Sequence, residues 1–289
     1  MIPTFVIFLR EGIEASMVVA ILLAYLDRTG QRHHFRTVYA GVAAALLLVT
    51  AGGVAAYLLV HRYEGSRFQT IFETVTYVLA AVVLTYMTFW MQRHARTMSG
   101  ELERRSEAAL SGGTRVGLAL LAFQSVGREG LETVVFTLAI VFASSSQSAS
   151  AGHSRWLLLG ACLGLLVALG IAWWIYRLGH RLNLGRFFRV LGVLLLFFAA
   201  GLLADAVENM QQLGWLPVLN SPMWHTTNLL SQGSAFGDVL HSFFGYSDSP
   251  TPLQLIAYVA YLAIVIVAFL GLRGALRAHR KAPRPATES

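Results

Sequence analysis

Charged residues are scarce in this sequence of 289 residues. They make up 13% of it, where a typical soluble protein has about 25%, and 56% of the residues are hydrophobic. This composition excludes an ordinary soluble globular protein and indicates a membrane protein. Cysteine is also nearly absent: Cys162 stands alone, which excludes an intrachain disulfide and a cysteine metal cluster. Its setting between Gly160 and Gly164 predicts a buried packing position, with the two glycines at a helix contact.

Long apolar runs dominate what remains. A helix needs about 20 consecutive apolar residues to cross the hydrocarbon core of a bilayer. Runs of that kind predict an all-α polytopic membrane protein with seven transmembrane helices. The predicted helices cover residues 3–26, 37–60, 68–91, 116–142, 156–176, 187–207 and 253–273.

The 22 arginine and lysine residues are distributed unevenly between the predicted loops. Most of them lie in one alternating set of loops and helix ends, which the positive-inside rule assigns to the cytoplasm. We therefore expect the N-terminus outside and the C-terminus in the cytoplasm. The same distribution accounts for the net charge of +7, so the charge does not indicate nucleic-acid binding. Charges interrupt the first apolar run, so we expect it to be retained as a helix and not removed as a signal peptide.

The sequence Arg-Glu-Gly-x-Glu occurs twice, each time inside an apolar segment. The copies consist of Arg10, Glu11, Gly12 and Glu14 in the first segment and of Arg128, Glu129, Gly130 and Glu132 in the fourth. An ionised side chain at the bilayer centre costs at least about 2.5 kcal/mol, so such charges predict a functional site, such as one for a cation. Residues three or four apart in a helix share a surface, which places both glutamates near their arginine. The glycine lets another helix or an ion approach the backbone closely.

The two copies divide the chain into halves. Each copy opens a block of three predicted helices, and an odd number of helices inverts the second block relative to the first. This pattern predicts an inverted-topology repeat with its site between the halves. The predicted parts are a first repeat over 1–92, a cytoplasmic connector over 93–115, a second repeat over 116–208, an extracytoplasmic loop with a short helix over 209–252, a seventh helix over 253–273 and a cytoplasmic tail over 274–289.

The available ligands limit the cation. All nine histidines fall in loops or at helix ends, so carboxylates are the ligands left inside the membrane. Carboxylates favour hard cations, whereas zinc and copper sites usually recruit imidazole or thiolate. Ferric iron fits this preference, and so do magnesium, manganese and calcium. The candidate metal ligands are Glu11, Glu14, Glu129 and Glu132, supported by Arg10, Arg128, Gly12 and Gly130.

Three further acidic residues, Glu73, Asp205 and Glu208, lie near the predicted outer ends of their helices. Together with the motif glutamates they could form an acidic access path that concentrates cations at the outer side. The alternative is that they only cap helices at the membrane interface.

The predicted outer segment before the last helix contains no lysine or arginine over 209–251. Trp215 and Trp224 suit an interfacial aromatic belt. Residues 234–244 can form a short amphipathic helix that carries Asp238 and His241. The segment is then either an interfacial cover or a lid or docking surface for an extracytoplasmic partner that delivers metal.

The paired motifs, in the first and fourth of seven helices, resemble those of the high-affinity ferric iron permease family, which includes fungal oxidase-dependent permeases and bacterial EfeU-type permeases. Gly245-Tyr246 and Pro250 before the last helix are similar to the family's pattern there. The resemblance covers about residues 3–273, although His225 follows Trp224 where the family has an acidic or amide residue. Two motifs in the right helices are a specific signal.

The resemblance implies a permease of the plasma membrane that imports ferric iron and needs no catalytic step or bound cofactor. The short loops favour a compact permease of the bacterial inner membrane. The resemblance further implies an extracytoplasmic partner that oxidises or binds iron. The four motif glutamates would be the translocation ligands, with both motif arginines in support.

Two alternatives stay open. One keeps transport but changes the cargo to a divalent cation, such as lead or manganese, or to protons. The other is a membrane oxidoreductase with carboxylate-bound metals. Sites of that second kind usually add a Glu-x-x-His pair within the helices, and no histidine lies within a predicted span.

Overall fold

The structure is a computed structural model. It describes residues 2–63, 65–94, 115–145, 151–178, 184–226 and 244–281, together with Leu230, Ser234, Gly237, Leu240 and His241. Asp238, residues 95–114 of the predicted connector over 93–115 and the end of the predicted tail lie outside these residues.

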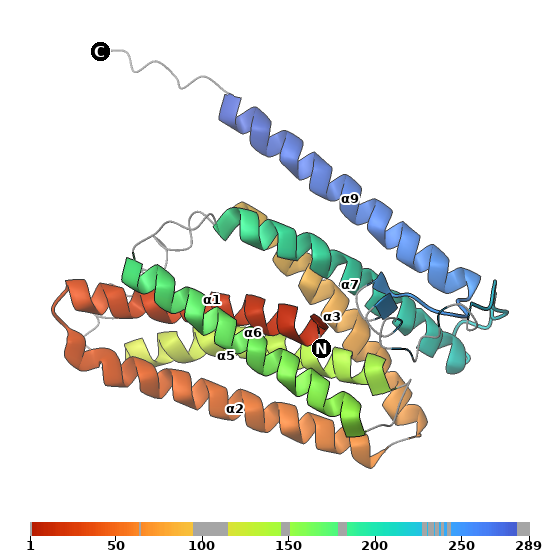
Figure 1. Ribbon diagram of the computed structural model, residues 1–289, viewed down its shortest axis with the longest axis horizontal. Helices are drawn as coiled ribbons and strands as arrows, with labels where there is room; N and C mark the ends of the chain where they lie inside the picture. The colour runs from red at the N-terminus through yellow and green to blue at the C-terminus, as the bar shows by residue number, and fades with distance from the viewer. Residues whose placement is uncertain are drawn as a thin grey trace.

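Long helices account for nearly all of the described chain, and these residues contain no strand. The elements in order are α1 (Ile2–Arg28), the short 3-10 helix η1 (Arg32–His34), α2 (Phe35–Arg62), α3 (Arg67–His94), α5 (Arg115–Ser145), α6 (Ala151–Leu178), α7 (Leu184–Gln212) and α9 (Pro252–Lys281) (Figure 1). The predicted all-α class is confirmed, and a helix covers each predicted span. Each helix exceeds its predicted range because helical hydrogen bonding continues past the apolar run into the polar flanks.

Five of the described helices are long and apolar enough to cross a membrane, and the chain is an integral membrane protein. They are α2, α3, α6, α7 and α9. The two other long helices, α1 and α5, carry the two Arg-Glu-Gly-x-Glu motifs, whose charges interrupt their apolar runs. The number of crossings and their orientation therefore stay predictions at this point.

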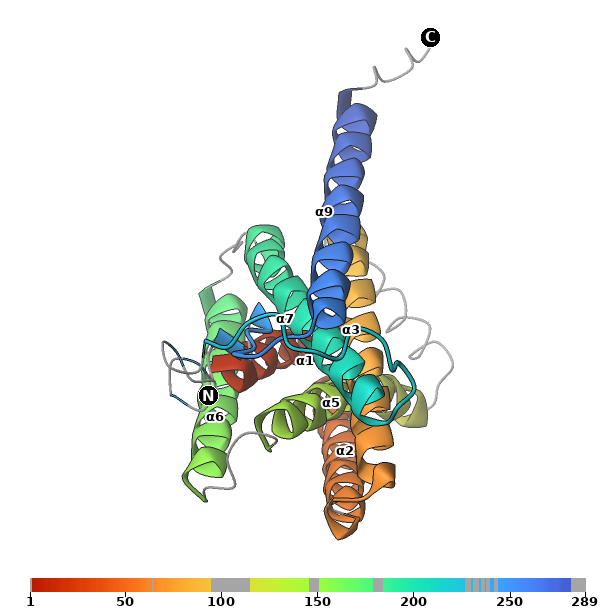
Figure 2. The same cartoon turned by 90° about the vertical axis from the view of Figure 1, so that its right-hand side faces the viewer.

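The helices of the two predicted halves interleave. The main contacts join α1 to α6, α2 to α5 and α3 to α7, while α1 also packs against α5 (Figures 1 and 2). The second helix of each predicted half thus covers the first helix of the other. The last helix, α9, packs against α7.

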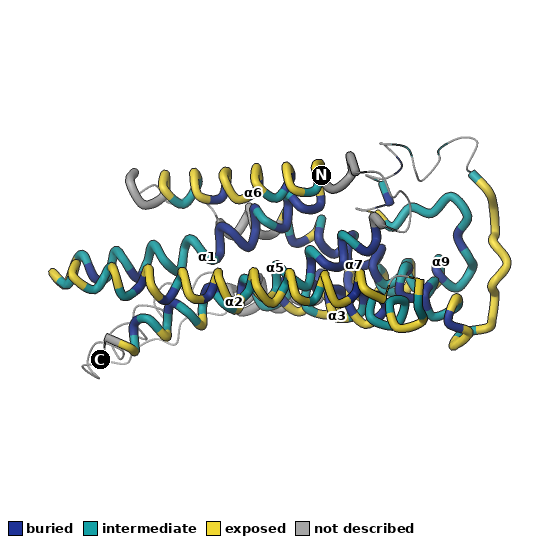
Figure 3. The backbone as a smooth tube through the Cα atoms, turned by 90° about the horizontal axis from the view of Figure 1, so that it is seen from below, coloured by how far each residue is buried: buried dark blue, intermediate teal, exposed yellow. Residues whose placement is uncertain are grey.

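Burial follows this arrangement. Within its most apolar stretch of 18 residues, α2 has 6% buried, whereas α7 has 56% buried. Helix α2 therefore lies at the periphery of the bundle and α7 in its interior. Figure 3 shows the outward faces of α2 and α6 as largely exposed. Exposed apolar residues such as Leu47, Leu166 and Val267 are what a lipid-facing surface requires.

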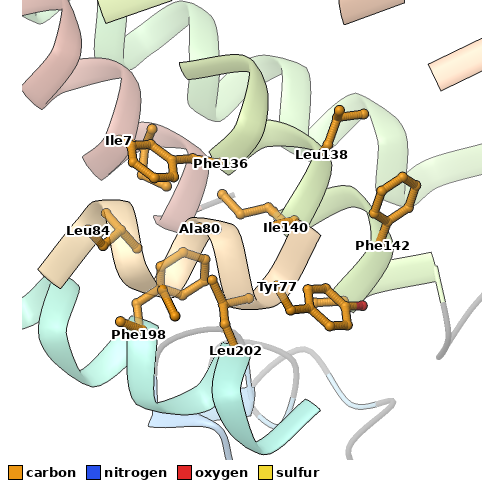
Figure 4. Close-up of a cluster of buried hydrophobic side chains, with 14 of the residues drawn as sticks. Ile7, Tyr77, Ala80, Leu84, Phe136, Leu138, Ile140, Phe142, Phe198 and Leu202 are labelled. Atoms are coloured by element: carbon orange, nitrogen blue, oxygen red, sulfur yellow. The ribbon is translucent and has the colours of Figure 1, made fainter. Parts of the chain in front are cut away.

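The main apolar core forms where α1, α3, α5 and α7 meet. Its buried side chains include Ile7, Leu84, Phe136, Phe198 and Leu202 (Figure 4). Threonines within the helices satisfy their hydroxyl groups locally: Thr74, Thr76 and Thr85 each donate to the backbone carbonyl four residues earlier, at 2.6 to 2.8 Å. The hydroxyl protons of these three threonines are thereby paired within the helix.

Glycines set how closely the interleaved helices approach. A Cβ atom placed on Gly41 of α2 would lie 2.2 Å from the carbonyl oxygen of Ala119 in α5, and one on Gly164 of α6 would lie 2.5 Å from the carbonyl oxygen of Phe5 in α1. The helix contact predicted for Gly164 is confirmed. Only a residue without a side chain fits at these two positions.

The predicted burial of Cys162 is wrong, because this residue is exposed. Residues four apart on a helix share a face, so Gly164 and Ala168 of α6 both meet α1. Cys162 lies two positions before Gly164, which turns it to the opposite side of α6.

We expect Gly41→Ala and Gly164→Ala each to lower the free energy of unfolding by about 1–3 kcal/mol, the usual cost of overpacking a well-packed contact. Thermal or denaturant unfolding of the detergent-solubilised protein measures this change. Gly52→Ala in α2 and Gly170→Ala in α6 are matched controls, because no neighbouring atom lies within 4 Å of a Cβ at either position. Equal destabilisation by the control substitutions would contradict the close-contact explanation.

Candidate metal site

The first motif lies in the buried part of α1. Arg10 Nη1 is 3.3 Å from Glu11 Oε1, and Arg10 Nε is 3.2 Å from Glu14 Oε1. All three side chains are about 3% exposed. The shared surface predicted from the spacing is present, and each carboxylate has a cation beside it.

The second motif repeats these pairs on α5. Arg128 Nη2 donates to Glu129 Oε1 at 2.9 Å, and Arg128 Nε is 3.5 Å from Glu132 Oε1. The surroundings differ from those of the first motif, because the side chain of Arg128 is 51% exposed and that of Glu132 is 14% exposed. The guanidinium carbon of Arg128 also lies 5.5 Å from the centre of the Trp90 ring on α3.

Glutamates from the two motifs meet between α1 and α5. Glu11, Glu14 and Glu129 each place one carboxylate oxygen within 4.8 Å of those of the other two, and all three residues are buried. We call these three residues the carboxylate triad. Among the described residues, no other group of histidine, cysteine, aspartate or glutamate meets this condition. Glu132 lies outside the triad but interacts electrostatically with Arg10 and Glu14.

The oxygens of these glutamates are short of hydrogen bonds. Both oxygens of Glu11, Oε1 of Glu14 and Oε2 of Glu129 and Glu132 are buried and accept no hydrogen bond. Oε1 of Glu11 and Oε1 of Glu14 still lie within 3.3 Å of the Arg10 guanidinium, whereas the Oε2 atoms just named have no such contact. A buried polar atom without any partner costs about 1–3 kcal/mol, and more when it is charged. Convergent carboxylate oxygens of this kind are the ligands that hard cations prefer. The triad therefore suits such a cation.

The motif glycines contact helices and do not face the triad. A Cβ on Gly12 would lie 2.8 Å from Cβ of Ala168 in α6, and one on Gly130 would lie 3.0 Å from the methyl groups of Val49 in α2. Of the two roles considered for these glycines, close helix packing is the one supported. The two glycines play equivalent parts in the two halves.

The three other predicted acidic residues gather at one end of the bundle, at the start of α3 and the end of α7. Glu73 accepts a hydrogen bond from Gln69 Nε2 at 2.8 Å, and Glu208 accepts one from Gln254 Nε2 at 2.7 Å. Asp205 Oδ2 lies 3.9 Å from His241 Nε2.

The acidic group at this end and the triad are not adjacent. Glu73 and Trp90 lie on the same helix, and the rise of an α-helix places them about 25 Å apart along its axis. Between them α3 contributes Tyr77, Ala80 and Leu84 to the apolar core. A buried apolar layer thus separates the proposed access path from the triad.

Two neighbours of the charged residues, His241 and Trp90, were not identified from the sequence. His241 is buried beside Asp205, and its Nδ1 lies 2.9 Å from the carbonyl oxygen of Tyr246. The Gly245-Tyr246 turn was the available signal, because Gly245 packs directly against Gly201 of α7 and thereby draws His241 inward. Trp90 ends an apolar run and has the sequence signature of an interfacial aromatic residue. By contrast, His225 is exposed.

A buried carboxylate and guanidinium cluster between helices of an integral membrane protein defines a class, the membrane proteins that bind or carry ions. The sequence profile of the Iron permease FTR1 family matches residues 1–281. The chain belongs to this family.

Curated relatives agree with this placement. The chain is 34% identical over 275 residues to the ferrous iron permease EfeU of Escherichia coli O6:K15:H31 (strain 536 / UPEC), covering 93% of this chain and 95% of the relative. It is also 34% identical over 271 residues to the ferrous iron permease EfeU of Yersinia pestis, covering 93% of each chain. No solved structure matches the chain.

We expect the two motif arginines to differ in their effect on stability. Arg10→Met leaves two buried carboxylates without their cation, which costs about 3–5 kcal/mol when a buried ion pair loses one partner. Arg128→Met is the matched substitution in the second motif, and we expect less than half of that loss because the Arg128 side chain is 51% exposed. Denaturant unfolding in detergent measures both, and equal losses would contradict the difference in burial.

Proposed function

We propose that this chain imports ferric iron, and that the cation is bound on its way by the glutamates of the two motifs. The observation that carries this proposal is the convergence of the three triad oxygens within 4.8 Å in a member of an iron permease family. The carboxylates would act as ligands, and Arg10 would offset their mutual repulsion while no cation is bound. Translocation needs no bond to be made or broken, so no catalytic residue is required.

We further propose seven membrane crossings, with the N-terminus outside and two inverted three-helix repeats over 1–92 and 116–208. The interleaved packing supports the repeat, because exchanging the halves converts the contact of α1 with α6 into that of α5 with α2. The same exchange leaves the contacts of α1 with α5 and of α3 with α7 unchanged. Rocking of such repeats against one another is the usual route to alternating access.

For the outer side we propose that Glu73, Asp205 and Glu208 attract the cation. The field of grouped carboxylates concentrates cations at such an entrance. An iron-oxidising or iron-binding partner would dock near the outer segment over 209–252, and the bacterial inner membrane is the location that this arrangement suits.

Ferrous iron is the second candidate cargo. The relatives cited above carry the name ferrous iron permease. Four glutamates and two arginines leave the motifs with a formal charge of minus two, which a divalent ion balances. Both oxidation states are compatible with carboxylate ligands, so the choice between them is experimental.

Proteoliposomes that contain the purified protein should accumulate radioactive iron, and Glu14→Gln or Glu129→Gln should reduce the initial rate at least tenfold. Even groups that only orient a metal ligand contribute 10–100-fold, and a ligand should contribute no less. Asp27→Asn is the matched control, because Asp27 is a carboxylate at the end of the same helix, paired with Arg32. Uptake by the glutamate variants at the wild-type rate would refute the proposed site.

The oxidation state of the cargo can be tested with the same vesicles. If ferric iron is carried, uptake from ferric citrate should be insensitive to a membrane-impermeant chelator specific for Fe(II), and a reductant should slow it. Uptake that requires the reductant and is blocked by the chelator would favour ferrous iron instead. Excess manganese or lead that abolishes iron uptake would point to a less selective cation carrier.

A further inference from the structure

The two motifs have the same residue types at the same spacing, but their accessibility differs. The side chain of Arg10 is 3% exposed and that of Arg128 is 51% exposed. A charged residue within a membrane-spanning helix almost always faces the bundle interior or a water-filled cavity. The exposed side of the cluster is therefore the side on which Arg128 lies, and we infer that it faces water.

The opposite side of the cluster is closed. One turn beyond the motifs, Ile7 of α1 and Phe136 of α5 join the apolar core together with Leu84 of α3, and all three are at most 1% exposed. No charged side chain belongs to this core. Among the described residues, the more exposed side of the cluster is thus the one formed by Arg128 and Glu132.

Trp90 holds the arginine in this opening. Its ring lies 5.5 Å from the guanidinium carbon of Arg128. The ring also packs against the apolar cluster that contains Leu9, Ile13 and Met91. Packing against Leu9 and Ile13 of α1 holds the Trp90 ring in place. The ring therefore gives Arg128 a second contact in addition to Glu129 and Glu132.

We propose that Arg128, held against the ring of Trp90, is a gate on the release side of the triad, and that Trp90 is the positioning residue of this gate. The inference rests on the proposed function. Arg128 is a tethered cation that competes with the cargo for Glu129 and Glu132. When the cargo occupies these carboxylates, the ring retains the displaced guanidinium in the opening and slows exchange.

The side on which this gate lies follows from α3. Glu73 lies near the start of α3 and Trp90 lies near its end. In the proposed orientation the gate faces the cytoplasm. The conformation described here is then closed toward the outside by the apolar core and gated toward the inside by Arg128.

The test measures binding and exchange of radioactive iron on the full chain in lipid nanodiscs, with iron supplied as ferric citrate and, under anoxic conditions, as Fe(II). A gate changes association and dissociation rates together. We expect Trp90→Leu to accelerate dissociation into excess unlabelled iron about two- to fivefold, the range that one exposed cation–π contact supports. The equilibrium dissociation constant should change less than twofold, and Trp90→Phe should give an intermediate rate.

Two comparisons separate the gate from a structural role. Trp156→Leu replaces an exposed tryptophan of α6 and should leave the exchange rate unchanged. In an Arg128→Leu background, Trp90→Leu should cause no further acceleration, since the ring acts through the arginine. An additive effect, a changed dissociation constant with an unchanged rate, or no effect of Trp90→Leu would overturn the proposal. A wild-type protein that retains no iron in either oxidation state would refute the proposed function itself and the gate with it.

Discussion

The pairing of buried charges inside α1 and α5 is the interaction on which the rest of the structure depends. Arg10 lies within 3.3 Å of both glutamates of its motif, and the three side chains are almost completely enclosed. Removing such charges from water is expensive, and the expense is tolerable only when opposite charges lie in contact. The neighbouring helices α2 and α6 enclose α5 and α1, and the close backbone contacts at Gly41 and Gly164 bring each of them directly against its motif helix.

Burial without full hydrogen bonding also links stability to function. The arginines offset the charge of the carboxylates but leave several of their oxygens without a hydrogen bond. A polar group in this condition lowers the stability of the empty protein and gives an incoming cation more to gain. The motif therefore meets two requirements, because its arginine makes buried carboxylates tolerable inside the membrane and still leaves ligand atoms available.

The sequence predicts the helices and the residue pairs within one helix more fully than it predicts which face of a helix makes a contact. Apolar runs predicted all the described long helices, because hydrophobic length is a direct requirement of the bilayer. The spacing of Glu11 and Glu14 from Arg10 predicted their pairing, because helix geometry alone determines it. The position of Cys162 was predicted wrongly, since flanking glycines indicate a contact but not which face of the helix makes it.

The difference between the two motifs could not be predicted at all. Their sequences are equivalent, and only the neighbours contributed by other helices distinguish Arg10 from Arg128. The position of Trp90 beside Arg128 is of this kind, because it depends on how α3 lies across α5. The same holds for His241, which the packing of Gly245 brings next to Asp205.

The contact between Gly245 and Gly201 also bears on how movement passes through the molecule. Because neither glycine has a side chain, the backbone at Gly245 lies directly against the backbone of α7 at Gly201. The segment that precedes α9 is thus in direct backbone contact with α7, an interior helix. Any displacement of α7 would be transmitted to the surface, where a soluble molecule could sense it or impose it.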